Sequence, residues 1–520
     1  MNVNSGYRNK WGLVSFLTLL SRIVGYFRDV IVAYLFGAGI QTDAFYVAFR
    51  IPNILRRLFA EGSLTVAFIP IFTEYLELKD EKEAKKALYS IFSVLLLILI
   101  LLTVLGVIFA PYVIKLYAYG FDEITFSTAV KLNRIMFPYI LFISLTALAM
   151  GVLNSVKHFF APAFSPVLFN ISMIICALLL YSHFDLPIIS LAIGVIIGGI
   201  CQLSLNLYFL KKKGFIFKFT KVFKHEAVRR VGMLMAPQLF GIAVYNINIL
   251  VNTQFASFMP TGTVSYLYFS ERLIEFPLGI IAVSIATVML PALSSDATIK
   301  NFENFKDKYY ESLRLMLYIM IPAMVGLIVL RVPICNILYQ HGEFDYIAVI
   351  KTSQALFGYG IGLWAIGGIR ITVPAFYALQ DTKTPVFIAF IAFIVNTISA
   401  YVLGFVFELN HLGLAIASSI SSTLNFLLLL YFLDNRLSNL INHELLSYIL
   451  KITAVSVFMG IIVMKIASLH AWTQSELSLY KVVIILSSIL IGAVFFFIAS
   501  RLLSIKELDS LVAILKRRKY

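Results

Sequence analysis

Charged side chains are scarce in this chain. Asp, Glu, Lys and Arg together make up 13% of its 520 residues, about half of their share in soluble domains. This shortage excludes an ordinary soluble protein, and the 60% share of hydrophobic residues supports the same conclusion. Apolar runs of about 20 residues, each long enough to cross a bilayer core, recur along the chain. The sequence therefore predicts an all-α polytopic membrane protein with about 14 transmembrane helices.

Several kinds of active site are also missing. The three cysteines lie in or beside apolar runs without metal-type spacing. There is no Gly-rich phosphate-binding loop for a nucleotide, so the chain is not an ATP-driven pump on its own. Neither a nucleophile with its base nor a cluster of acidic metal ligands can be assembled, which disfavours a lipid-phosphate transferase or phosphatase. We expect a transporter without a cofactor or bound metal, rather than an enzyme.

The formal net charge is +15, which in a soluble chain would suggest a nucleic-acid partner. The basic residues instead follow the positive-inside rule. Alternate connections hold clusters such as Lys79–Lys86 and Lys211–Arg230, whereas the connections between them, such as Ser182–Pro187, have almost no Lys or Arg. Both termini are therefore predicted to be cytoplasmic, with no nucleic-acid partner. The polybasic end Lys516–Lys519 is expected to lie on anionic lipid.

The chain is predicted to form two lobes. Its longest soluble-looking stretch, Lys211–Arg230, divides about six apolar runs from about eight. Residues 1–214 would form an N-lobe, residues 215–438 a basic linker followed by a C-lobe, and residues 439–520 two further helices and a basic tail. A weak internal repeat, Thr42–Pro70 against Thr263–Pro291, favours two pseudo-symmetric six-helix lobes, an arrangement that transporters use to build a central site.

Arginines occur inside the first two apolar runs, within Ser21–Gly62. A charge near the bilayer midplane costs about 2.5–3.5 kcal/mol, so these side chains must face protein or water. Arg22 and Arg28 point about 120° apart on a regular helix. Either the first helix bends at Gly25 or the two arginines serve different neighbours.

The second apolar run has a polar stripe. A period of 3.6 residues places four charged side chains on one face of this helix: Asp43, Arg50, Arg57 and Glu61. A second charged group lies in the segment YFSERLIEFPLG, where Arg272 stands between Glu271 and Glu275. Ser265 is seven residues before Arg272 and shares its face.

Three interpretations of these charges remain open from the residues alone. They could be structural ion pairs, a gating network in a small-molecule antiporter, or a cationic cavity for an anionic substrate. Arginines outnumber their acidic partners in these segments, and the guanidinium fork matches phosphate and carboxylate groups. The cavity is therefore favoured, and the candidate substrate-binding residues are Arg22, Arg28, Arg56 and Arg272.

Four stretches resemble the MurJ (MviN) family of bacterial lipid II flippases, within a superfamily of drug and polysaccharide exporters. They are SRIVGYFRDVIVAYLFGAGIQTDAFYVAFRIPNILRRLFAEG, PAFSPVLFNISMI, FASFMPTGTVSYLYFSERLIEFPLGI and FYALQDTKTP. The resemblance runs over essentially the whole chain. It implies a fourteen-helix fold of the inner membrane. It also implies movement of the undecaprenyl-diphosphate-linked peptidoglycan precursor from the cytoplasmic to the periplasmic leaflet by alternating access.

The resemblance also implies roles for individual residues. The family's essential arginines fall on Arg22, Arg28, Arg56 and Arg272, which agrees with the candidates above. Positions expected at the cavity or its gates are Asp43, Ser265, Glu271, Glu275, Arg57, Glu61 and Arg370. Glu271 stands where many relatives have Asp, which keeps the charge.

The implied partners are lipid II, membrane lipids and the cell-wall synthesis machinery. The implied energy source is the membrane potential or a monovalent cation. The alternative is a flippase or exporter of another lipid-linked glycan or of a small molecule. A drug exporter should have an acidic lining, which this sequence does not favour, whereas a flippase for another glycan would share the arginines.

Overall fold

The computed structural model describes residues 3–56, 64–437, 440–476, 478–505 and 507. Within these ranges the backbone forms helices joined by turns and contains no β-strand. Contacts group the chain into two compact units, Met1–Val264 and Ser265–Tyr520. The prediction of an all-α membrane fold is confirmed.

In the first unit, α8 packs against both α1 and α9, while α7 packs on α9 and α3. α2 packs on α6, and α10 packs on α3, α4 and α5. The helices of this unit are α1 (Val3–Phe36), α2 (Ile40–Arg56), α3 (Leu64–Leu78), α4 (Glu81–Ile108), α5 (Ala110–Tyr117), α6 (Glu123–Met136), α7 (Tyr139–Ser155), α8 (Phe160–Leu180), α9 (Ile189–Lys212) and α10 (Glu226–Ser257).

Two adjacent glycines let α9 approach its neighbours closely. A Cβ atom on Gly198 would lie 2.8 Å from the Phe169 ring of α8, and one on Gly199 would lie 2.8 Å from the Tyr139 ring of α7. Small residues at helix contacts allow this approach, which in a membrane supplies much of the packing energy.

In the second unit, α18 packs on α15, α16 and α17, and α13 packs on α16 and α19. A π-helical turn, η3 (Leu278–Ala282), joins α11 to α12. The helices are α11 (Thr263–Pro277), α12 (Val283–Thr298), α13 (Phe302–Val329), α14 (Arg331–Tyr339), α15 (Tyr346–Gly360), α16 (Leu363–Ala378), α17 (Lys383–Tyr401), α18 (Asn410–Leu437), α19 (His443–Ala467) and α20 (Leu479–Leu502).

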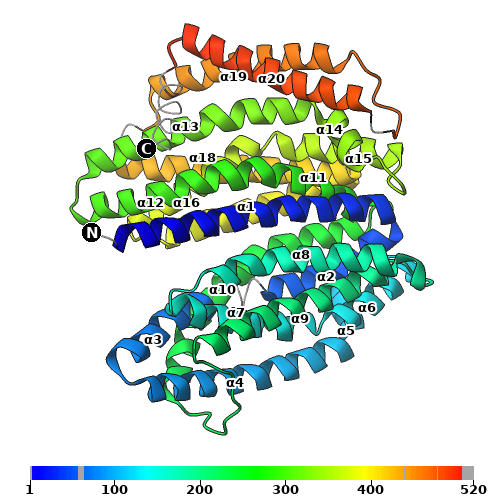
Figure 1. Cartoon of the computed structure of the whole chain (residues 1–520). Coiled ribbons are helices and arrows are strands. Elements are labelled where there is room, and N and C mark those ends of the chain that lie inside the picture. Colours follow the sequence, from blue (N-terminus) through cyan, green and yellow to red (C-terminus); the bar gives the residue numbers. More distant parts are fainter. Residues whose placement is uncertain (1–2, 57–63, 438–439, 477, 506, 508–520) are drawn as a thin grey trace. The chain divides into compact units, whose positions relative to one another are not determined.

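The last two helices, α19 and α20, lie side by side (Figure 1) and are fastened to the second unit at both ends. At one end, Arg314 of α13 pairs with Glu444 at 2.9 Å and with Glu507 at 2.5 Å. At the other end, the buried Lys481 Nζ donates to Asn336 Oδ1 of α14 at 3.2 Å. These contacts fix both ends of the helix pair to α13 and α14.

The number of membrane spans is settled only in part. By length and composition, ten stretches of the described helices could cross a membrane, or eleven if α15 and α16 form one broken span. α1, α2 and α10 are not among these stretches. The count of fourteen, the cytoplasmic termini and the domain boundaries after residues 214 and 438 remain predictions.

Candidate functional site

Arg28 of α1 is buried, with 9% of its surface exposed. Its Nε and Nη2 donate to Asp29 Oδ1 at 3.1 and 2.7 Å. Its Nη1 donates to Asn170 Oδ1 of α8 at 3.0 Å. One guanidinium thus joins a carboxylate of its own helix to an amide of the neighbouring helix.

Arg22 lies two turns earlier on the same helix and is partly exposed. It makes no ion pair or hydrogen bond with any residue that the structure describes. α1 continues through Gly25 as one α-helix. The two arginines therefore differ in their surroundings, since Asp29 and Asn170 hold Arg28; the two alternatives derived from the sequence remain predictions.

The polar stripe of α2 meets the far end of α10. Asp43, buried to 2% exposure, accepts a hydrogen bond of 2.6 Å from the backbone N–H of Gly262. About two turns later on α2, Nη1 of Arg50 donates a hydrogen bond to the hydroxyl of Thr253. The spacing of Asp43 and Arg50 on one helix face is therefore confirmed by partners on a single neighbouring segment.

The C-terminal part of the stripe is described only as far as Arg56, whose Nε donates to Asn53 Oδ1 at 2.9 Å. Arg57 and Glu61 lie outside the described residues. The pairing expected between them remains a prediction.

The second unit holds the remaining predicted residues. In α11, Arg272 pairs with Glu275 at 3.0 Å, one turn along the helix. Ser265 is fully buried and Glu271 is exposed. Arg370, half-buried on α16, forms no ion pair or hydrogen bond within the described ranges.

The segment FYALQDTKTP forms the end of α16 and the turn into α17, as expected for a helix end. Gln380 has a positive φ of 58°, and Asp381 accepts from the backbone N–H groups of Lys383 and Thr384 at 3.0 Å. Burial alone would raise the pKa of Asp381, but hydrogen bonds from Thr384 and the charge of Arg436 hold that pKa below its usual range. Asp381 is therefore a helix cap.

Several partners could not be identified from the sequence. Asn170 and Thr253 are polar residues in largely apolar helices, which indicates a hydrogen bond but not its partner. The pair between Glu74 and Arg230, which joins α3 to α10 through two hydrogen bonds of 2.6 and 2.8 Å, connects residues far apart in the chain. No pattern of spacing predicts such a pair.

No metal centre is found in the ranges that the structure covers: they contain no group of three or more His, Cys, Asp and Glu side chains that could hold an ion. The three cysteines are free thiols. The predicted residues offer guanidinium groups in each unit. In the first unit, amides, a hydroxyl and a carboxylate hold Arg28, Arg50 and Arg56, and in the second unit a carboxylate holds Arg272.

Comparison with known proteins identifies the family. The family model described as "Lipid II flippase MurJ" matches residues 32–483, a range that includes Arg56 and Arg272 and begins after Arg28. The chain is 38% identical over 426 residues to a "Probable lipid II flippase MurJ" of Vibrio cholerae, covering 80% of this chain and 81% of that relative. It is 33% identical over 501 residues to another from Rickettsia prowazekii, covering 96% and 98%.

Solved structures show the same relationship. A structure described as "Lipid II flippase MurJ, inward closed conformation" has a TM-score of 0.79 and 31% identity, covering 94% of this chain and 99% of that one. A multidrug transporter of the MATE family in an inward-facing conformation has a TM-score of 0.67 at 14% identity, covering 82% and 94%. The second likeness concerns the fold alone.

Proposed function

This chain belongs to the MurJ family of lipid II flippases, and we propose that Arg22, Arg28, Arg56 and Arg272 bind the diphosphate of its substrate. The chain is a multi-pass inner-membrane transporter rather than an enzyme, and it moves lipid II by alternating access. Lipid II joins a long isoprenoid to a sugar–peptide headgroup through a diphosphate. Moving that charged linkage across the bilayer requires groups that replace the water around it.

Guanidinium groups suit this task because their planar forks donate two parallel hydrogen bonds to phosphate oxygens and stay charged at every physiological pH. Arg22 is the observation on which the proposal mainly rests. It is a cation inside an apolar helix without a carboxylate partner among the described residues. A phosphate ligand would compensate a charge that the described residues leave uncompensated.

Arg28 would act differently, because Asp29 and Asn170 already hold its guanidinium. A diphosphate would have to share Arg28 with these groups or replace Asp29 as the anion beside it. We propose that this competition limits how tightly the substrate is held, so that it can also be released on the other side.

The remaining predicted residues are proposed to line the substrate's path or to gate it. They are Asp43, Ser265, Glu271, Glu275, Arg57, Glu61 and Arg370. The contact of Asp43 with the N–H of Gly262 supports a gating role, since it joins α2 to the turn before α11. Coupling to the membrane potential or a monovalent cation, and contact with cell-wall synthesis proteins, remain proposals that rest on the family resemblance.

Complementation tests the proposed site in cells. A bacterial host is depleted of its own lipid II flippase and supplied with this chain or with single Ala variants of Arg22, Arg28, Arg56 and Arg272, at matched membrane levels. Access of lipid II to a periplasmic probe is the readout. Arg229→Ala is the matched control, because Arg229 is exposed at the start of α10. Rescue by the parent and the control, with failure of the four variants, is expected; rescue by all four variants would refute the site.

A further inference from the structure

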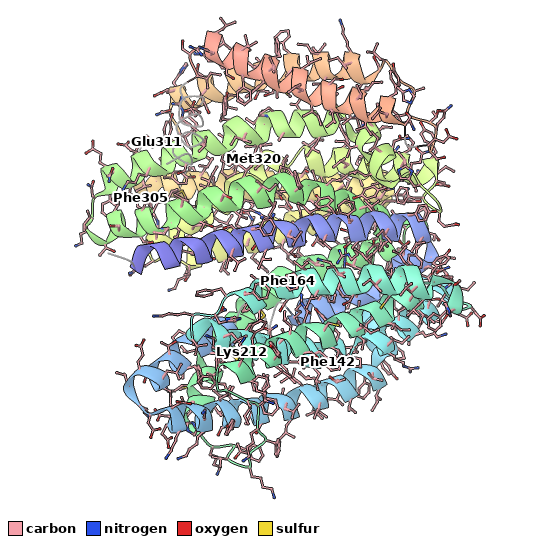
Figure 2. The ribbon with its side chains drawn as sticks, viewed as in Figure 1. Phe142, Phe164, Lys212, Phe305, Glu311 and Met320 are labelled. Carbon is pink, nitrogen blue, oxygen red and sulfur yellow. The ribbon has the colours of Figure 1, made fainter. Side chains whose placement is uncertain are left out.

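The connection between α9 and α10 is a basic and aromatic segment with a structure of its own. Residues 211–224, called the strap below, read KKKGFIFKFTKVFK and contain no acidic residue. After Lys212, which Figure 2 labels at the end of α9, the chain forms no helix until Glu226. It runs as an extended loop beside α3 and α4 (Figure 1).

The inner side of the strap is fixed to the first unit. Phe215 is buried and packs against Phe72 of α3, with ring centroids 5.7 Å apart. Phe217 stacks on Phe92 of α4 at 4.7 Å. The N–H of Thr220 donates to Ser93 Oγ at 2.8 Å. The strap is therefore not a loose linker, and its conformation is defined by α3 and α4.

These contacts place the strap near a membrane boundary. α4 has its last charged residue at Lys86, and the uncharged run Ala87–Ile108 that follows is about 33 Å long at 1.5 Å per residue, close to the thickness of a hydrocarbon core. Phe92 and Ser93 lie about 8–9 Å into this run, while the ring of Phe215 in the strap also lies 5.7 Å from Nζ of Lys85, before the run begins. The strap thus extends from the charged end of α4 to its first apolar turns and crosses the boundary between headgroups and acyl chains.

The outer side of the strap is apolar and basic together. Four apolar side chains are well exposed: Ile216 at 48%, Phe219 at 49%, Val222 at 56% and Phe223 at 42%. Three exposed lysines, Lys218, Lys221 and Lys224, alternate with them. Exposed aromatic rings beside lysines, at this depth, are the composition of a membrane-surface segment. An apolar surface of this kind is unfavourable in contact with water alone.

We propose that the strap is a docking surface for anionic phospholipid headgroups in the leaflet on its side. Phe219 and Phe223 enter the boundary between headgroups and acyl chains, while Lys218, Lys221 and Lys224 contact lipid phosphates. The absence of any acid in the strap makes the surface selective for anionic over zwitterionic lipid. By holding the ends of α3 and α4 in the leaflet, this contact anchors the first unit at the membrane surface.

Lipid-selective quenching tests the proposal. The full-length chain receives Phe219→Cys for a bimane label, with Cys201→Ala, since Cys176 and Cys335 are buried. It is reconstituted in phosphatidylcholine vesicles containing phosphatidylglycerol, and nitroxide lipids with either headgroup are added separately. Phe223→Cys is a second labelling position in case the first disturbs the strap.

The labelled parent is expected to be quenched by both lipids and to prefer phosphatidylglycerol by about fivefold or more, the effect of one or more lysines at the surface. In the variant with Lys218, Lys221 and Lys224 changed to Gln, the preference should fall to about one. The control changes Lys300, Lys383 and Lys451 to Gln, which removes equal charge from exposed positions of the second unit, and should keep the preference.

Two results would overturn the proposal. Equal quenching by both lipids in the parent, or an equal loss in both triple variants, would show that the strap does not select anionic headgroups. No quenching by either lipid would show that Phe219 lies away from the bilayer, and a protein partner would then replace the lipid surface as the interpretation.

Discussion

Removing the negative charge of Asp29 tests how the first unit holds its buried arginine. Asp29→Asn keeps the shape of the side chain but turns a charge-assisted pair into a neutral one. Arg28 would retain its hydrogen bond to Asn170 at 3.0 Å and lose the carboxylate that now accepts at 2.7 and 3.1 Å. The guanidinium would then be buried with less compensation for its charge.

The expected cost follows from the burial of the pair. Asp29 is 1% exposed and Arg28 is 9% exposed, so solvent screens the interaction little. Breaking a buried ion pair from one side costs about 3–5 kcal/mol, and we expect the lower end, about 3 kcal/mol, because the amide oxygen can still accept. At about 2 °C per kcal/mol for a unit of this size, Tm should fall by about 6 °C or more.

Thermal unfolding of the purified protein in nanodiscs measures this change. Glu81→Gln is the control, because it breaks the ion pair between Glu81 and Lys85. The side chains of Lys85 and Glu81 are 31% and 66% exposed, and exposed pairs contribute about 0–1 kcal/mol. The double variant Arg28→Gln with Asp29→Asn removes both charges and should recover much of the loss. A fall in Tm for Asp29→Asn no larger than the control's, or no recovery in the double variant, would refute the reasoning.

Three other changes have expected outcomes. Gly198→Val should separate α8 from α9 and cost about 1–3 kcal/mol, seen as a lower Tm, whereas Gly232→Ala, with open space around its Cβ, should not. Lys481→Met should leave Asn336 Oδ1 without the Lys481 donor, while the carbonyl of Gln474 keeps only its bond from Asn336 Nδ2. The loss should cost about 1–3 kcal/mol, and faster proteolysis of residues 468–476 would reveal it. The pKa of Asp381 is lower in the folded protein than in the unfolded chain, where it is about 3.9. Its carboxylate therefore stabilises the fold above the unfolded pKa, and this stability is lost as the pH falls toward the folded pKa. Asp381→Asn should flatten the acid side of a plot of Tm against pH.

The sequence was sufficient for the class of fold and for the helices that hold the arginines. Composition and the length of the apolar runs predict a helical membrane protein, because a bilayer admits few other structures. Helical periodicity correctly placed Asp43 and Arg50 on one face. Periodicity also shows that Arg22 and Arg28 cannot share a face of a regular helix, since the angle between two side chains on such a helix depends only on their spacing.

Partners distant in the chain could not be predicted in the same way. The hydrogen bond from Arg28 to Asn170 depends on α8 packing beside α1, and the contact of Asp43 depends on a backbone N–H at Gly262. From its polarity alone, Lys211–Arg230 is predicted only to be a basic linker between two lobes. Phe215 and Phe217 of this stretch pack on α3 and α4, which only the position of those helices reveals.

Binding of lipid II by the purified protein tests the central claim most directly. The parent should bind lipid II, and each of Arg22→Ala, Arg28→Ala, Arg56→Ala and Arg272→Ala should weaken binding by about tenfold or more, since a hydrogen bond to a charged group contributes about 1.5–3 kcal/mol. Arg229→Ala should bind as the parent does. If the four variants keep the parent's affinity while the proteins remain folded, these arginines do not bind the diphosphate and the account is wrong.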